Sequence, residues 1–249
     1  MRVLVACEES QVVCKAFRER GHEAYSCDII DCSGGHPEWH IKQDVLEILN
    51  PHQITYSFYG IVFRTVDGEA HAFKGKWDLI IAHPPCTYLS NAGACRLYPK
   101  KGQLNQERYQ KGLEAKEFFL KFLNADCDKI AVENPVPSKI FDLPKYTQII
   151  QPYEHGHPFT KKTCLWLKGL PKLTPTDVVK PAGPYVCGNA EIWKKQAQKG
   201  IVYGKEKSAK HRSKTFLGIG RAMAEQWGKQ ERGDINGGTQ NVCQDNSDK

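Results

Sequence analysis

Two short segments carry the side chains best suited to chemistry, Pro84-Pro85-Cys86 and Glu133-Asn134-Pro135. A cysteine thiolate is a strong nucleophile, and a carboxyl group can give or take a proton. Each segment follows an apolar run that has the pattern of a buried parallel strand. Because ligands bind at the carboxyl ends of the strands in open α/β sheets, we expect Cys86 and Glu133 to share one rim as a catalytic pair. The alternative is that Cys86 is a small buried residue that caps a strand.

The elements that must position this pair form an alternating pattern of strands and helices. A strand at 2–6, a helix at 12–20 and a strand at 22–29 form a unit of the kind that connects parallel strands by a right-handed crossover. Further elements are expected as strands at 79–82, 129–132 and 161–167 and as helices at 113–123 and 215–227. The sequence therefore predicts an α/β, Rossmann-like sheet with helices on both faces.

A hairpin is predicted as an insertion at about 53–73. Alternating apolar residues through Thr65 indicate one strand, Asp67-Gly68 is a turn signal, and a return strand follows at 70–73. This hairpin could equally be an edge decoration or a surface for self-association.

Composition limits the class of protein. The chain has 249 residues, of which 40% are hydrophobic and 25% charged, enough for one domain with a core and an appendage. No apolar run is long enough to cross a bilayer, and the first residues enter a strand without a signal peptide, so we expect a cytoplasmic protein with no membrane partner. Ten cysteines without a Cys-x-x-Cys spacing favour reduced thiols.

The distribution of positive charge points to an anionic partner. The formal net charge is +7, and residues 169–212 are irregular and basic, with Lys194, Lys195 and Arg212 among the basic residues around two aromatic residues. Such interleaving can follow a phosphate backbone while bases stack on the rings. A solvated lysine-rich surface is the plainer alternative. The polar, glycine-rich tail at 231–249 is predicted to be disordered.

The end of the second strand offers a ligand-binding acid. Asp28 occupies the position at which nucleotide-type folds hold a ribose diol, because a carboxylate accepts two hydrogen bonds. A solvated acid at a strand end is the alternative. Zinc is a further alternative here, because Cys27, Cys32, His36 and His40 have compatible spacings, and His155 with His157 is a weaker candidate. We favour the cofactor interpretation and expect no metal.

Together these segments resemble the DNA cytosine-5 methyltransferases, especially the short, divergent members found in phages and prophages, from residue 2 to residue 227. Pro84-Pro85-Cys86 is similar to the Pro-Cys nucleophile motif of that family, and Glu133-Asn134-Pro135 to its Glu-Asn-Val motif. The resemblance implies S-adenosylmethionine as cofactor, DNA as partner and a bacterial or phage-infected cell as location. It also implies that Cys86 adds to carbon 6 of a flipped cytosine while Glu133 protonates or hydrogen-bonds the ring nitrogen.

The same resemblance implies further site residues. Cofactor contacts are expected from Ala6, Cys7, Glu8, Ser10, Asp28, Ile29, Asp44, Val45, Pro84 and Thr215. Substrate contacts are expected from Pro85, Ser90, Asn91, Asn134, Lys161, Lys194, Lys195 and Arg212, and Lys162 is expected as a third catalytic residue. The Cys86 thiolate would need a lowered pKa, for which backbone N–H groups or Lys161 or Lys162 are the expected sources.

The implied organisation has four parts. Residues 1–168 would form the catalytic, cofactor-binding domain, 169–212 a small basic DNA-recognition region, and 213–230 a segment that returns to the catalytic domain, ahead of the tail. The oligomeric state is left open between a monomer and a weak dimer.

The chain also departs from the family pattern. The glycine-rich first turn, Phe-x-Gly-x-Gly, is replaced by residues 6–10, Ala-Cys-Glu-Glu-Ser, so the backbone is not expected to approach the cofactor in the same way. The Gln-x-Arg-x-Arg motif has no match, and Lys161-Lys162-Thr163 occupies the corresponding strand, where lysine does not replace a bidentate arginine. Base specificity would then be loose or supplied in part by the 53–73 hairpin.

Two rival functions stay open. His83-Pro84-Pro85-Cys86 is a near relative of the Asp/Asn/Ser-Pro-Pro-Tyr/Phe motif of methyltransferases that act on the exocyclic amino groups of cytosine or adenine. Those enzymes need neither the cysteine nor a Glu-Asn partner. The other rival is a non-enzymatic DNA-binding relative that has lost cofactor binding, which the altered first turn would permit.

Overall fold

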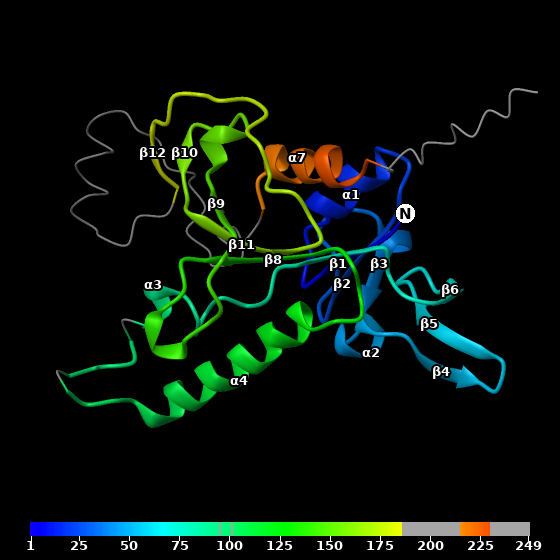
Figure 1. Ribbon diagram of the computed structural model, residues 1–249, viewed down its shortest axis with the longest axis horizontal. Coiled ribbons are helices and arrows are strands. Elements are labelled where there is room, and N and C mark those ends of the chain that lie inside the picture. The colour runs from blue at the N-terminus through cyan, green and yellow to red at the C-terminus, as the bar shows by residue number, and fades with distance from the viewer. Residues whose placement is uncertain (95, 101, 186–214, 230–249) are drawn as a thin grey trace, which may run out of the picture.

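The computed structural model describes residues 1–94, 96–100, 102–185 and 215–229, which form a mixed α/β fold around a seven-stranded sheet (Figure 1). The strand order is β3-β2-β1-β7-β8-β11-β9. The first five run parallel, whereas β11 is antiparallel to both of its neighbours. The strands are β1 (Arg2–Ala6), β2 (Glu23–Asp28), β3 (His40–Lys42), β7 (Leu79–Ala82), β8 (Ile130–Pro135), β9 (Gln148–Ile150) and β11 (Thr163–Lys168). The predicted α/β sheet is confirmed, and its topology is compatible with a Rossmann-like fold.

Helices cover both faces of this sheet. The main ones are α1 (Val12–Arg18), α2 (Leu46–Leu49), α3 (Asn91–Ala94), α4 (Gln106–Leu123) and α7 (Leu217–Trp227). Helices α1 and α7 pack on one face, and α2 and α4 lie on the other (Figure 1). Residues 3–6 of strand β1 are all apolar because both faces of the strand are buried. Val3 and Val5 pack towards α1 and α7, while Leu4 and Ala6 face the core on the other side of the sheet. No helix in the described part of the chain is long and apolar enough to cross a membrane.

The chain changes direction within the sheet between β1 and β7. From β1 it proceeds outward to β2 and β3, and after β7 it proceeds the other way to β8. The backbone N–H of His83 donates to the carbonyl of Ala6 at 2.9 Å, so the residues that leave these two strands begin side by side. In open α/β sheets such a switch point is where the crevice for a ligand forms, at the carboxyl ends of the strands.

Helix α4 begins earlier than the periodicity predicts. A helix was expected from residue 113, yet α4 starts at Gln106, where the Asn105 side chain accepts a hydrogen bond from the N–H of Arg108 at 2.9 Å. The first turns are polar because they face solvent, and a capping side chain supplies the stability that apolar packing does not. Only the later part of the helix shows the apolar pattern, with Phe119 and Phe122 buried.

The predicted hairpin is a separate three-stranded antiparallel sheet of β4 (His52–Thr55), β5 (Phe58–Arg64) and β6 (Ala70–Lys74). The expectation of one long first strand is wrong, because the chain turns back at residues 56–57. The side chains of β4 are all exposed, so no buried face requires the strand to continue.

The position of this small sheet also corrects its expected role. Phe63 stacks on Trp77 with ring centroids 5.8 Å apart, and the Arg2 guanidinium lies 4.4 Å from the centre of the Phe73 ring. Arg2 begins β1, and Trp77 precedes β7. The small sheet therefore packs towards the amino ends of these strands, away from the Cys86 loop, which argues against its part in recognising a base.

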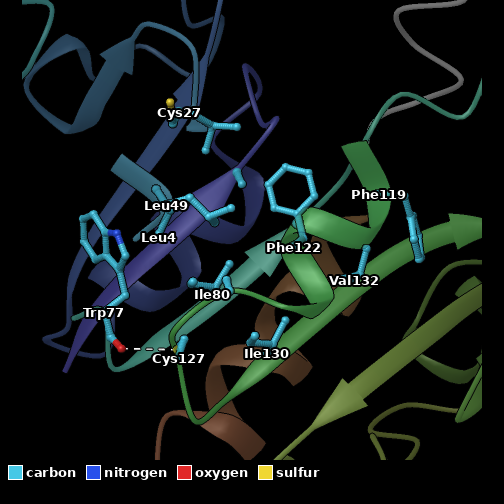
Figure 2. Close-up of a cluster of buried hydrophobic side chains, with 14 of the residues drawn as sticks. Leu4, Cys27, Leu49, Trp77, Ile80, Phe119, Phe122, Cys127, Ile130 and Val132 are labelled. Atoms are coloured by element: carbon cyan, nitrogen blue, oxygen red, sulfur yellow. Dashed lines mark hydrogen bonds between the residues drawn. The ribbon is translucent and has the colours of Figure 1, made fainter. Parts of the chain in front are cut away.

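We expect Trp77 to be the most costly residue to remove from the core. It is 1% exposed, its Nε1 donates to the Ile48 carbonyl at 2.7 Å, and it belongs to the buried cluster that Figure 2 shows. Trp77→Ala should lower the free energy of unfolding by about 3–5 kcal/mol, measured by urea denaturation, because a large cavity remains. Tyr56→Ala is the matched control, since Tyr56 is fully exposed, and it should change stability by no more than about 0.5 kcal/mol. Equal losses in the two variants would contradict this assignment of the core.

Candidate active site

The carboxyl ends of β7 and β8 bring a histidine and a glutamate together. The register pairs Ile80 with Ile130 and Ala82 with Val132, so the next side chains along the same rim are His83 and Glu133. His83 Nδ1 lies 3.1 Å from Glu133 Oε2, and the two side chains are only 10% and 12% exposed. The predicted adjacency of these two strands is thus confirmed, but the expected end of the second strand at Glu133 is wrong, because β8 continues to Pro135 as it pairs with β11.

Opposing effects determine the charge of this pair. Burial by itself lowers the pKa of His83, but the hydrogen bond and charge of Glu133, together with the charge of Glu8, outweigh it and leave that pKa raised. Burial by itself raises the pKa of Glu133, but the His83 hydrogen bond and the positive charges of His83 and Lys161 outweigh it and leave that pKa lowered. Both shifts favour an imidazolium that is hydrogen-bonded to a carboxylate.

The Cys86 thiol is neutral at rest. Burial raises its pKa, the negative charge of Glu133 raises it further, and the positive charge of Lys161 opposes these effects without overcoming them. The expectation of a lowered pKa is therefore wrong, because burial and the charge of Glu133 together outweigh the charge of Lys161. Lys162 is exposed, and its charge acts on Cys164, so the lysine whose charge reaches the Cys86 thiol is Lys161.

The loop that follows Cys86 is tied to the segment after β8. The N–H of Ser90 donates to the Cys86 carbonyl at 3.1 Å, Asn91 N–H donates to the Val136 carbonyl, and Ser138 N–H donates to the Leu89 carbonyl. Ser90 is buried, and its Oγ accepts from the N–H of Gly93 at 3.2 Å, so it stabilises the loop. Pro85 and Asn91 are exposed and lie where a ligand can reach them.

Asn134 lies on the opposite side of β8 from Glu133, because side chains alternate along a strand. It is fully buried, and neither its Oδ1 nor its Nδ2 has a hydrogen-bond partner among the described residues. It therefore presents no surface to a substrate in this structure, although it was expected to contact one.

The first loop makes a left-handed turn without glycine. Ala6 is buried in β1, and Cys7 then adopts a φ of 57°, a conformation that costs a non-glycine residue about 1–2 kcal/mol. The Glu8 carboxylate turns inward and accepts from the N–H groups of Val13 and Cys14 at 2.7 and 3.1 Å, at the start of α1. The missing glycines therefore do not prevent the turn. Glu8 stabilises the start of α1, while burial raises the pKa of its carboxyl group against the opposing effects of His83 and the two N–H groups.

Acidic side chains cluster beside this turn. After burial, the charges of Asp28 and Asp44 are among the causes that raise the pKa of the Cys7 thiol, which places both near it. Each carboxylate accepts a local backbone hydrogen bond, from Ile30 N–H and Leu46 N–H respectively. The other expected cofactor residues are Ile29, which is 72% exposed, and Ser10, Val45 and Pro84, which are buried. Two carboxyl groups and an exposed apolar side chain thus lie beside the switch point, and carboxylates accept hydrogen bonds from the hydroxyl groups of a ligand.

The end of the site near β11 is formed by residues distant in sequence. Thr215 precedes Phe216, whose ring lies 5.8 Å from Lys161 Nζ and 4.7 Å from the Tyr185 ring, centre to centre. The described part of the predicted recognition region, 169–185, packs against the rest of the domain, with Leu173 in the core. Lys194, Lys195, Arg212 and the 231–249 tail lie outside the described residues.

The zinc alternative gains no support. No group of three or more His, Cys, Asp or Glu side chains among the described residues could hold a metal ion. Both ring nitrogens of His40 are engaged, with Ser26 Oγ and the Ile30 carbonyl at 2.9 Å each. His157 Nε2 accepts from the Gly218 N–H, and the seven described cysteines are all free thiols.

His83 is the residue of this candidate site that the sequence interpretation did not assign to it. Its signal was a histidine at the end of a buried strand, three positions before Cys86, in register with an acid on the neighbouring strand. No protein-family model matches the chain, and a search of curated proteins finds no match either.

Proposed function

We propose that this protein is an S-adenosylmethionine-dependent DNA methyltransferase that methylates carbon 5 of cytosine through a covalent adduct with Cys86. The observation that carries the proposal is that the Cys86 thiol and the buried Glu133 carboxylate are neighbours on the rim of two adjacent parallel strands. A thiol and a carboxyl group are the two groups that this chemistry requires, one to attack carbon 6 and one to stabilise charge at the ring nitrogen.

The charge states support a proton transfer between the two groups. The Cys86 S–H bond must break as the sulfur bonds to carbon 6. Because the charge of Glu133 acts on this thiol, we assign to the Glu133 carboxylate the role of taking the proton and giving it to the ring nitrogen. The ring electrons then accumulate at carbon 5. The bound cofactor would supply an electrophilic methyl group, and Asp28, Asp44 and Ile29 are the residues that would hold it. A water molecule would take the carbon-5 proton as the sulfur–carbon bond breaks, and the proton on the ring nitrogen would return through Glu133 to the departing Cys86 sulfur.

The first test identifies the product and the adduct. DNA incubated with S-adenosylmethionine and the protein should contain 5-methylcytosine by nucleoside mass spectrometry. DNA that carries 5-fluorocytosine should remain attached to Cys86, because fluorine cannot leave as the proton does, and peptide mapping would locate the bond.

The alternative functions give different results in the same assay. N4-methylcytosine or N6-methyladenine without an adduct would replace the proposal with amino-group methylation. DNA binding with no methylated base and no cofactor binding at millimolar concentration would indicate a non-enzymatic DNA-binding protein.

A further inference from the structure

The first turn of α4 holds the loop that carries Cys86. The Arg108 guanidinium donates from Nη2 to the Thr87 carbonyl at 3.1 Å and to the Gly93 carbonyl at 3.0 Å, and from Nε to Gly93 at 3.3 Å. Its Cζ also lies 4.9 Å from the centre of the Tyr88 ring. One side chain therefore contacts the loop directly after Cys86 and again near the end of α3.

The loop is folded tightly enough for one guanidinium to span it. A Cβ at Gly93 would lie 2.0 Å from the Thr87 oxygen, so the backbone at Gly93 passes directly against the backbone that follows Cys86. The Asn105 cap in turn binds the N–H of Arg108, which fixes the origin of the side chain. The planar fork of an arginine can donate to two carbonyls while it stacks on an aromatic ring.

We propose that Arg108 is a positioning residue for Cys86, because it joins the two ends of the loop that follows Cys86, at Thr87 and Gly93, and so fixes the direction of the thiol relative to Glu133. The catalytic consequence of this role rests on the proposed function, whereas the structural role does not. Lysine cannot replace it, because a single ammonium neither stacks in the same way nor reaches both carbonyls in one plane.

The test compares Arg108→Lys with Lys111→Met, a control on the same helix. Lys111 is at the surface and pairs with Glu107 at 2.6 Å. Hydrogen exchange by mass spectrometry should show the amides of Ser90, Gly93 and Ala94 exchanging roughly 5- to 30-fold faster in Arg108→Lys, with the later turns of α4 unchanged. Lys111→Met should leave the loop as it is.

The activity measurement separates positioning from stability. In Arg108→Lys, kcat for cytosine methylation should fall about 10- to 100-fold with little change in KM, because a misplaced nucleophile affects the chemical step. Unchanged loop exchange, or faster exchange along the whole of α4, would overturn the proposal, as would a loosened loop with an unchanged kcat. If the unmodified protein makes no methylated DNA, the proposed function fails, and the exchange experiment still decides whether Arg108 holds the loop.

Discussion

Cys86→Ser is expected to lower the rate of 5-methylcytosine formation by roughly 10⁴-fold or more, to the limit of detection. Serine keeps the shape and the hydrogen-bonding ability of the side chain, but its hydroxyl is a much weaker acid and a much weaker nucleophile towards carbon 6. Because Cys86 is neutral at rest, its proton must be removed as the sulfur attacks, and a serine hydroxyl at the same place gives up that proton far less readily. Initial rates of methyl transfer from labelled S-adenosylmethionine to DNA measure the loss.

Cys127→Ser is the matched control for this substitution. Cys127 is 1% exposed and lies just before the amino end of β8, away from Glu133. Its thiol can donate to the carbonyl of Trp77, as Figure 2 shows, or to that of Lys129, each at 3.2 Å, and a hydroxyl can do the same. This variant should retain the rate of the unmodified protein within a few-fold. A methylated product that survives in Cys86→Ser would rule out covalent catalysis by Cys86 and favour amino-group methylation.

His83→Ala is expected to lower the free energy of unfolding by about 3–5 kcal/mol, because it leaves the buried Glu133 carboxylate without its partner. His36→Ala is the matched control, since His36 and Glu38 form the same kind of pair at 2.8 Å with side chains 37% and 41% exposed. An exposed ion pair is worth about 0–1 kcal/mol, so this control should change stability little. Urea denaturation of the three proteins gives the comparison, and equal losses in both variants would contradict the assignment.

The stabilisation from the buried pair should also depend on pH. Glu133 has a lowered pKa in the folded protein, so its contribution is present above the ordinary glutamate pKa of 4.5 and is lost as pH falls through the lowered value. His83 has a raised pKa, so its contribution is present below the ordinary histidine pKa of 6.5 and is lost as pH rises through the raised value. The deficit of His83→Ala should therefore be largest between about pH 4.5 and 6.5. A deficit that is constant with pH would show that His83 acts only by packing.

A double variant separates the cost of an uncompensated buried charge from the cost of lost packing. His83→Leu combined with Glu133→Leu removes both charges and should recover much of the stability that His83→Ala loses, because apolar residues can replace a buried ion pair at little cost. If the double variant is as unstable as His83→Ala, the loss comes from packing.

Local pattern alone predicted the main strands and the neighbourhood of the two reactive segments. The apolar runs that precede Pro84 and Glu133 indicate buried parallel strands whatever lies around them, and parallel neighbours place their carboxyl ends on one rim. The same rules could not show where an alternating segment has no buried face. The single strand expected through Thr65 is therefore two strands in the structure. They also could not show that a side-chain cap starts α4 at Gln106.

The charge state of the site was decided by the tertiary structure. The sequence identified Cys86 and Glu133 and supplied lysines to activate the thiol, but the pKa of a thiol depends on its burial and on the distance of every charge around it. Those distances depend on the register that places His83 against Glu133 and on the loop that Arg108 holds. Residue types and spacing therefore determined which groups meet, and only the packing of strands distant in sequence determined that Glu133 is a carboxylate and Cys86 a neutral thiol.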